Sequence, residues 1–252
     1  MDHKVALVTG AARGLGRAMT VALLDKGVKV CIADVLEEVG KATTKELQEK
    51  YGQKQVYFVF CDVTKPEQFK DAWNKCEEDL GTPTLLVNNA GIGDEQNWKK
   101  TLDVNLGGCI AGTLLAMEKL TKKDGGSGGR VVNISSIAGI KTLPFGPIYS
   151  ATKSGIVGFS RALGHPLHYS LTGVQVQCLC PSLAETTFIQ EAMKTAFSDD
   201  IRKATAKITG TFTALTPETV AAAFVKLIEE GPNGAVLVVE GAKEPYYVYA
   251  SQ

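Results

Sequence analysis

The stretch KVALVTGAARGLGRAM, residues 4–19, decides the fold. It begins with a short apolar run that is typical of a buried strand, and it continues with residues spaced as on one face of a helix. A glycine-rich turn between a strand and a helix is the setting in which backbone N–H groups at the helix N-terminus bind phosphate. The turn contains three glycines, Gly10, Gly14 and Gly16.

Each glycine of the turn has its own expected role. Gly10 allows the tight turn, Gly14 lets the backbone approach a pyrophosphate, and Gly16 lets the helix pack closely on the strand. The gap between the first two is one residue longer than in the common dinucleotide fingerprint, so this turn is related to that fingerprint without being identical. A glycine turn without a ligand is the alternative, but the flanking strand and helix favour dinucleotide binding.

The rest of the chain repeats the alternation of short apolar runs with longer segments of helical period. The expected strands are residues 4–9, 28–33, 55–60, 84–89, 130–135, 174–180 and 235–240. The expected helices are residues 14–26, 35–50, 66–79, 96–120, 148–165 and 217–229. This alternation predicts an α/β fold: a single Rossmann-type domain over residues 1–252, with a seven-stranded parallel sheet and helices on both faces.

Composition argues against several classes of partner. Lys plus Arg and Asp plus Glu number 27 each, so no net charge attracts nucleic acid or an anionic membrane. No stretch approaches the roughly 18 apolar residues of a membrane span, and the apolar run near the start is too short for a signal peptide. We therefore expect a cytoplasmic protein that binds a small neutral or amphipathic ligand and neither nucleic acid nor a membrane.

Six cysteines are scattered along the chain, mostly inside apolar runs. Only Cys178 and Cys180 are close together, and their spacing places both on one face of an expected strand. This is not the CxxC spacing of metal ligands, so we expect reduced, buried thiols and no metal site.

Two carboxylates follow expected strands at the edge where a dinucleotide would bind. Asp34 lies about 20 residues beyond the glycines, where a carboxylate bonds the adenosine ribose and repels a 2′-phosphate, which favours NAD over NADP. Arg13, within the turn, is the opposing feature, because its guanidinium could pair with that phosphate. Asp62 and Val63 are expected to contact the adenine, although Asp62 would need no explanation as an ordinary loop residue.

The stretch IYSATKSG, residues 148–155, places Tyr149 and Lys153 one helical turn apart. A nearby ammonium, together with the positive ring of an oxidised nicotinamide, is expected to lower the pKa of the phenol from its usual value near 10. Tyr149 would then accept a proton from a hydroxyl group. An ordinary amphipathic helix face is the alternative for the pair taken alone.

Four motifs in order resemble the short-chain dehydrogenase/reductase family over nearly the whole chain. They are TGAARGLG (9–16), NNAG (88–91), NISS (133–136), and the pair Tyr149 and Lys153. Within the family the chain is most similar to the NAD-dependent 15-hydroxyprostaglandin dehydrogenase branch and its invertebrate relatives. The stretches that carry this closer similarity are KVALVTGAA (4–12), NNAGIGDEQNWKKTLDVNL (88–106) and GIVGF (155–159).

The resemblance implies an NAD-dependent oxidoreductase that moves a hydride between nicotinamide and a hydrophobic secondary alcohol or ketone, as a homodimer. It implies that Ser136 bonds the substrate oxygen, that Lys153 also bonds the nicotinamide ribose, and that Asn105 holds a water linking Lys153 to solvent. With the turn and carboxylates above, the expected cofactor-binding set is Gly10, Arg13, Gly14, Leu15, Gly16, Asp34, Asp62, Val63, Asn89, Ala90, Gly91, Pro181 and Thr186.

The chain departs from the family pattern at three places. Ser182 replaces a glycine after Pro181, which would require a positive φ from serine or displace the nicotinamide. Pro166 interrupts the expected helix 148–165, which should end or kink just before it, with His165 and His168 facing solvent or an interface. Gly146 stands three residues before Tyr149, where prostaglandin-specific relatives carry a polar side chain.

An apolar substrate pocket is expected beside the tyrosine. Its predicted walls are Leu143, Phe145, Ile148 and a lid over about 186–213 that contains Phe188, Ile189, Met193, Phe197 and Phe212. Ordinary core packing is the alternative for these apolar residues. The C-terminal EPYYVYASQ, residues 244–252, could close over the pocket or join a subunit interface.

Two other functions stay open at this stage. The first is a dinucleotide-binding protein of the same fold with little or no turnover, which Ser182 and the interrupted helix favour. The second is a purely structural protein, which would leave the glycine turn and Asp34 without an explanation.

Overall fold

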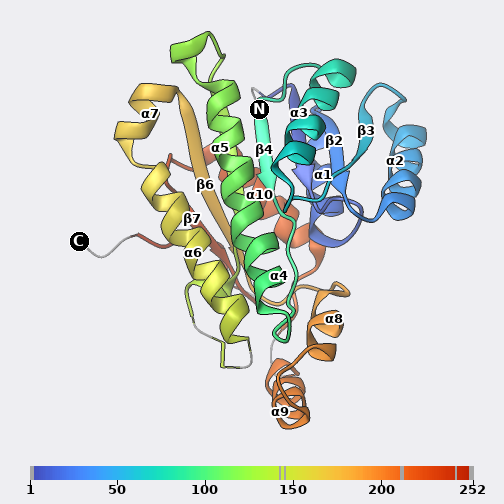
Figure 1. Cartoon of the computed structure of the whole chain (residues 1–252), viewed down its shortest axis with the longest axis vertical. Coiled ribbons are helices and arrows are strands. Elements are labelled where there is room, and N and C mark those ends of the chain that lie inside the picture. Colours follow the sequence, from blue (N-terminus) through green and yellow to red (C-terminus); the bar gives the residue numbers. More distant parts are fainter. Residues whose placement is uncertain (1–2, 142, 145, 211–212, 242, 250–252) are drawn as a thin grey trace.

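The computed structural model describes residues 3–141, 143–144, 146–210, 213–241 and 243–249 (Figure 1). Its centre is a sheet with the strand order β3-β2-β1-β4-β5-β6-β7-β8. The strands are β1 Val5–Thr9, β2 Lys29–Asp34, β3 Val56–Phe60, β4 Leu85–Asn88, β5 Gly129–Ile134, β6 Val174–Pro181, β7 Val236–Val239 and β8 Tyr246–Tyr247. The first seven are parallel, which confirms the predicted α/β Rossmann-type sheet.

The predicted strand count of seven is wrong by one. β8 pairs antiparallel with β7 through only two residue pairs, Leu237 with Tyr247 and Val238 with Tyr246. A two-residue strand is too short to produce a recognisable alternation of apolar and polar residues. The C-terminal segment therefore extends the edge of the sheet as far as it is described.

Helices cover both faces of the sheet (Figure 1). The helices around the sheet are α1 Gly14–Asp25, α2 Glu37–Tyr51, α3 Pro66–Leu80, α4 Trp98–Leu102, α5 Gly108–Leu120, α6 Pro147–Leu163, α7 Pro166–Thr172 and α10 Pro217–Glu230. The helices α8 Phe188–Lys194 and α9 Asp199–Thr209 lie together at one end of the molecule, with α9 the farther from the sheet. Short turns of other helical types are η1 Asp103–Gly107, η2 Lys122–Asp124 and η3 Ile137–Gly139.

Each strand contributes alternate side chains to two apolar layers, as period-two geometry requires. On β1, Ala6 and Val8 belong to the layer formed with α1 and α10. Val5 and Leu7 belong to the opposite layer, formed with α3 and α5. Continuous apolar strands of this kind are what a parallel sheet covered on both faces demands.

The predicted helix 148–165 ends where proline geometry requires. α6 stops at Leu163, and α7 begins with Pro166, which confirms the expected interruption. The exposed His165 caps α7, because its Nδ1 accepts a hydrogen bond from the Leu167 N–H at 3.2 Å. In the described part of the chain, no helix combines the length and the apolar character needed to cross a membrane.

The predicted helix 96–120 is not continuous. It is divided into α4, the single π turn η1, and α5. Isolated π turns inside helices occur frequently at functional sites. The turn contains Asn105, one of the predicted site residues.

Candidate active site

A cavity of about 1180 Å³ brings most of the predicted site residues together. It lies where the loops that follow β1, β2, β4, β5 and β6 meet, the usual ligand position in an open parallel sheet. The predicted residues that line it are Gly10, Arg13, Gly14, Leu15, Asp34, Asp62, Val63, Asn89, Ala90, Gly91, Ser136, Tyr149, Lys153, Pro181 and Thr186. Gly16 and Asn105 are buried behind this lining.

The glycine turn has the geometry that its sequence predicts. Gly10 and Gly14 have φ values of 63° and 58°, in the left-handed region that favours glycine. A Cβ at Gly16 would lie 2.2 Å from the Gly10 carbonyl oxygen, so only glycine fits where α1 leaves the turn. The Asn89 side chain donates to the carbonyls of Thr9 and Gly10 at 3.0 and 2.9 Å, which ties β4 to the turn.

Asp34 is fixed at the end of β2 by backbone groups. Its two carboxylate oxygens accept from the N–H groups of Ala12 and Leu36 at 2.9 and 3.0 Å. The residue is only 7% exposed, and it lines the cavity. Each oxygen can accept a further hydrogen bond, so the carboxylate is oriented for a ligand hydroxyl.

Asp62 and Val63 form the next part of the same wall. One oxygen of Asp62 accepts from both the N–H and the hydroxyl of Thr64, at 2.9 and 2.8 Å. Val63 is buried and contributes an apolar surface to the cavity. The two hydrogen bonds from Thr64 fix the orientation of the carboxylate. A freely solvated loop aspartate would lack such a fixed orientation.

Arg13 is directed toward α8. One terminal guanidinium nitrogen lies 2.9 Å from a Glu191 carboxylate oxygen, and the other donates to the second oxygen at 3.0 Å. The first nitrogen also donates to the Thr187 hydroxyl at 3.0 Å. The cation of the glycine turn is therefore paired with α8, whose Glu191 lines the same cavity.

Ser136, Tyr149 and Lys153 line the same cavity from β5, η3 and α6. Lys153 Nζ lies 5.4 Å from the centre of the Tyr149 ring and donates to the Ile134 carbonyl at 2.9 Å. A Cβ at Gly91 would lie 3.6 Å from that Nζ, so glycine leaves space beside the amine. The i to i+4 spacing thus gives the expected proximity of the two side chains.

The protein's own groups raise the pKa of Tyr149 rather than lower it, and the lowering expected from a nicotinamide charge beside the phenol stays a prediction. Burial raises the pKa of Tyr149 to about 12, and the hydrogen bond with the Ser136 hydroxyl offsets only part of that rise. Burial also lowers the pKa of Lys153, because the ammonium is equally desolvated. Desolvation, which the spacing of the two residues does not reveal, outweighs their proximity.

Asn105 is held by the backbone of Ile92. Its Oδ1 accepts from the Ile92 N–H, and its Nδ2 donates to the Ile92 carbonyl, both at 2.8 Å. A Cβ at Gly91 would lie 3.4 Å from Asn105 Oδ1, on the side where Lys153 also approaches. Asn105 therefore fixes the loop that follows β4 next to α6, where its Nδ2 also donates to the Thr152 hydroxyl at 3.2 Å.

Glu95 is a site residue that the sequence analysis missed. It is 4% exposed, and its carboxylate oxygens accept from the N–H groups of Ile148 and Tyr149 at 3.0 and 2.9 Å. It thus satisfies free N–H groups in the first turn of α6, where a negative charge is favoured. Glu95 is separated from these partners by more than 50 residues, so no local pattern reveals the contact.

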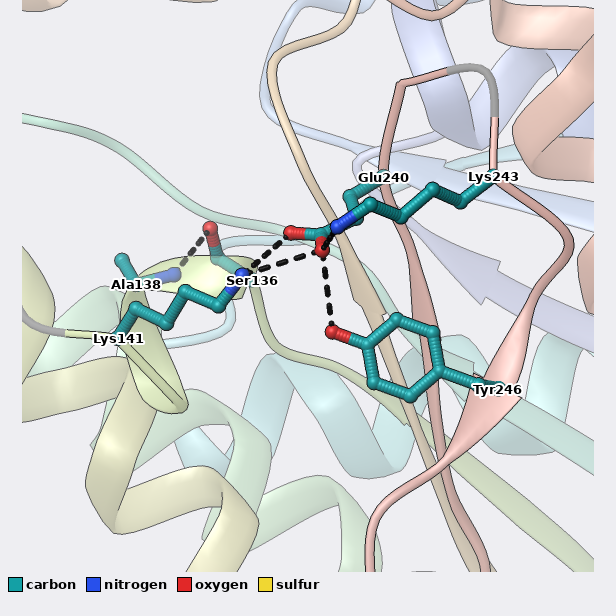
Figure 2. Close-up of polar contacts among 6 residues, drawn as sticks. All are labelled: Ser136, Ala138, Lys141, Glu240, Lys243 and Tyr246. Carbon is teal, nitrogen blue, oxygen red and sulfur yellow. Dashed lines mark hydrogen bonds and ion pairs between the residues drawn. The ribbon is translucent and has the colours of Figure 1, made fainter.

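A second missed cluster is centred on Glu240 (Figure 2), and three of its members, Lys141, Glu240 and Lys243, line the cavity. Glu240 accepts from Lys141 at 2.8 and 3.1 Å, from Lys243 at 2.8 Å and from the Tyr246 hydroxyl at 3.3 Å. The two lysines hold the pKa of Glu240 at about 2. This cluster links the loop after Ser136 to the β7–β8 hairpin.

The predicted apolar walls are assembled in part. The Phe188 ring lies 5.4 Å from the Tyr149 ring, centre to centre, and a smaller cavity of about 60 Å³ adjoins the pair. Leu143, Ile189 and Met193 line this smaller cavity.

Other predicted wall residues lie elsewhere. Phe197 is 49% exposed, and Ile148 lines neither cavity, so both predictions are wrong. Ile148 instead uses its N–H to bond Glu95, in the first turn of α6. Phe145 and Phe212 lie outside the described residues.

Ser182 does not adopt the strained backbone that its replacement of glycine suggested. Every residue with positive φ in the described ranges is a glycine. The Ser182 N–H donates to the Val239 carbonyl at 2.7 Å, which keeps the segment in line with β7. Its hydroxyl oxygen is buried and has no partner among the described residues, although the residue lines the cavity.

The six cysteines are buried free thiols, as expected. The sulfurs of Cys178 and Cys180 lie 3.8 Å apart, which confirms that both occupy one face of β6. Over the described part of the chain, no three His, Cys, Asp or Glu side chains are grouped as metal ligands would be.

Comparison with known proteins identifies the family. A family model described as short chain dehydrogenase matches residues 4–196. The 15-hydroxyprostaglandin dehydrogenase [NAD(+)] of Rattus norvegicus is 37% identical over 251 residues, covering 96% of this chain and 93% of the relative. Alcohol dehydrogenase 1 of Ceratitis capitata is 33% identical over 207 residues, covering 82% and 79%.

Solved structures agree with the family model. The crystal structure of levodione reductase superposes with a TM-score of 0.82 at 26% identity, covering 94% of this chain and 96% of that one. The fold that contains the cavity is therefore one that dehydrogenases of this family share. The chain is a member of the short-chain dehydrogenase family and an oxidoreductase enzyme.

Proposed function

We propose that this enzyme uses NAD to interconvert a hydrophobic secondary alcohol and its ketone, in the manner of a 15-hydroxyprostaglandin dehydrogenase, in the cytoplasm. One observation carries the proposal. Ser136, Tyr149 and Lys153 meet in the same cavity that Gly10, Gly14 and Asp34 line. A dinucleotide lying along this cavity would join the two groups of residues.

The residues of the cavity fit a dinucleotide. Gly10 and Gly14 expose bare backbone at positive φ, and a Cβ at Gly14 would point at Thr186 from 3.5 Å, into the space a pyrophosphate needs. The N-terminus of α1 faces this space with its free N–H groups. The unpartnered hydroxyl of Ser182, which lines the same cavity as Thr186, is available to the nicotinamide.

Asp34 and Arg13 both favour NAD over NADP. The oriented carboxylate of Asp34 would bond the ribose hydroxyls and repel a phosphate placed there. Arg13, the feature that opposed this preference in the sequence, is engaged by Glu191 and Thr187. Its charge is therefore matched within the protein.

The proton chemistry is assigned to Tyr149. Bound NAD supplies the hydride acceptor, and its positive ring lowers the pKa of a phenol beside it. Ser136 orients the substrate oxygen toward Tyr149, which accepts the hydroxyl proton as the alcohol is oxidised and returns it in the reverse reaction. Lys153 keeps a positive charge beside the phenol, and Asn105 with Glu95 hold the segments that carry both groups.

The substrate preference follows from the apolar surfaces next to Tyr149. Phe188, Ile189 and Leu143 line both the main cavity and the smaller one. We assign the segment from about 186 to 213, with α8 and α9, as the substrate lid. An alkyl or ring-containing body suits this lining better than a charged one.

A homodimer completes the proposal. Leu114 projects from α5 with 52% of its surface exposed, an apolar surface that a second subunit would cover. Light scattering at two protein concentrations tests the dimer independently of catalysis. A monomer at micromolar concentration would contradict it.

A dinucleotide-binding protein with little turnover is the second candidate. Burial favours it, because desolvation raises the pKa of Tyr149 to about 12 and so disfavours the phenolate that would accept the substrate proton. The two candidates share cofactor binding and differ only in hydride transfer.

A substrate panel with both cofactors separates the candidates. Secondary alcohols and ketones with prostanoid, steroid, retinoid and aliphatic bodies are mixed with NAD or NADP, and absorbance at 340 nm is followed. We expect turnover with NAD and at least one hydrophobic substrate. Binding of NAD without turnover across the panel would favour the second candidate, and a tenfold or larger preference for NADP would contradict the interpretation of Asp34.

A further inference from the structure

The position of Arg13 in the glycine turn suits phosphate binding, but its ion pair with Glu191 directs the guanidinium elsewhere. Its backbone follows Ala12, whose N–H fixes the Asp34 carboxylate at 2.9 Å. An arginine side chain that begins at this point can reach a phosphate on the adjacent ribose. Its guanidinium instead lies against Glu191 and Thr187, which line the same cavity.

The contacts between Arg13 and Glu191 use the planar geometry of both groups. Two guanidinium nitrogens meet two carboxylate oxygens at 2.9 and 3.0 Å, which is the bidentate arrangement. Bidentate pairs are the stronger class of charged hydrogen bond, and they fix the direction of the guanidinium. A phosphate monoester presents the same pattern of oxygens, so it would compete with Glu191 for the same nitrogens.

We propose that Glu191 is a specificity-determining residue, which discriminates against NADP by holding Arg13 away from the 2′-phosphate. Asp34 disfavours that phosphate by direct repulsion, and Glu191 removes the cation that would compensate for it. Specificity built in this way depends on denying a favourable contact to the wrong ligand. This inference rests on the proposed use of NAD and adds a residue that does not touch the ribose.

The proposal concerns Glu191 alone, and a nearby glutamate that does not contact Arg13 provides the control. Glu185 lies six residues before Glu191 in the chain and is exposed. It forms no ion pair with a described residue. Its removal changes the net charge of the protein by the same amount as removal of Glu191. Lys99 and Lys100 also line the cavity and could bind a phosphate themselves. The experiment must therefore show that any gain in NADP⁺ binding on removal of Glu191 depends on Arg13.

Titration calorimetry with NAD⁺ and NADP⁺ tests the proposal without requiring turnover. The proteins are the wild type, Glu191→Gln, Glu185→Gln, and the double variant Arg13→Gln with Glu191→Gln. The quantity compared is the ratio of the Kd for NAD⁺ to the Kd for NADP⁺ within each protein. Melting temperatures verify that the variants are folded.

We expect Glu191→Gln to raise this ratio about tenfold in favour of NADP⁺. Glu185→Gln should leave the ratio within about twofold of the wild type, and adding Arg13→Gln should abolish the gain. An unchanged ratio in Glu191→Gln, an equal gain in Glu185→Gln, or a gain that survives loss of Arg13 would each overturn the inference. Failure of the wild type to bind NAD⁺ would instead contradict the proposed function itself.

Discussion

The two sides of the cavity are built in different ways. The glycine-turn wall, formed by residues 9–16 with Asp34 and Asn89, is held mainly by buried hydrogen bonds to the backbone. The α8–α9 segment, residues 188–209, buries only Thr205 within its helices. It contacts the rest of the molecule through the Arg13–Glu191 ion pair and the Tyr149–Phe188 ring contact. It also forms two hydrogen bonds of 3.0 Å with the loop after β4, from Thr195 to the Gly93 carbonyl and from Gln96 to the Ala196 carbonyl.

This difference indicates which side is preorganised and which can move. Backbone groups held by buried hydrogen bonds cannot shift without leaving polar atoms unpaired. A segment whose helices bury almost no side chains has few contacts to lose when it moves, so it can open locally. We expect the first wall to bind cofactor in a fixed geometry and the second to adapt to substrate.

The largest effect is expected from Gly16→Ala on the glycine-turn wall. The new Cβ would approach the Gly10 carbonyl oxygen to 2.2 Å, so the turn must deform. We expect a loss of about 1–3 kcal/mol in the free energy of unfolding, together with weaker dinucleotide binding. Urea unfolding and calorimetric titration measure the two quantities.

Gly158→Ala is the matched control for that substitution. Gly158 lies inside α6, and its added Cβ would meet no atom within 4 Å. This change should stabilise the protein by about 0.5–1 kcal/mol, because alanine is the better helix former. Equal stability of the two variants would show that the glycine turn is less constrained than its contacts indicate.

Phe188→Ala tests the α8–α9 segment, and we expect its effect on substrate binding to be intermediate in size. It removes the ring that lies 5.4 Å from Tyr149, a contact that contributes about 0.5–1.5 kcal/mol. The KM for a hydrophobic substrate should rise several-fold while the melting temperature changes little. Phe197→Ala, from the same segment but 49% exposed, should leave KM unchanged. Unfolding caused by Phe188→Ala would mean that the segment belongs to the structural core.

The smallest effect is expected from Glu240→Gln, in the cluster that links the loop after Ser136 to the β7–β8 hairpin (Figure 2). The lysines hold the pKa of Glu240 at about 2, below its ordinary value of 4.5. A lowered pKa in the folded state gives stability that is present above pH 4.5 and is lost as the pH falls toward 2. Because both lysines are more than half exposed, we expect about 1 kcal/mol at neutral pH.

Unfolding measured across the pH range tests this dependence. The stability difference between the wild type and Glu240→Gln should be constant from pH 5 to 7 and should vanish near pH 2. A difference that grows as the pH falls would have the wrong sign for a carboxylate held by cations.

Regular alternation made most of the fold predictable. The seven parallel strands and the principal helices follow from long, well-separated apolar patterns, and Pro166 marks the end of α6. β8 has two residues, and α8 has only seven, so neither is long enough for a pattern to accumulate. The division of residues 96–120 depends on the π turn around Asn105, which follows from tertiary contacts with Ile92.

The parts of the site that escaped prediction all depend on distant contacts or on burial. Glu95 meets α6 across more than 50 residues, and Lys141 meets Glu240 across 99. The pKa of Tyr149 is raised by desolvation, which the one-turn spacing to Lys153 does not reveal. Motifs located the proposed reactive residues, but only the folded structure supplies their electrostatic surroundings.

The most direct measurement is turnover and NAD⁺ binding of Tyr149→Phe in the same preparation. Removing the hydroxyl deletes the proposed proton acceptor while the ring can still pack against Phe188. The account predicts that turnover falls by at least about 10³-fold while the Kd for NAD⁺ changes by less than about threefold. Turnover close to that of the wild type, with NAD⁺ still bound, would contradict the assignment of Tyr149 as the group that exchanges the proton with substrate.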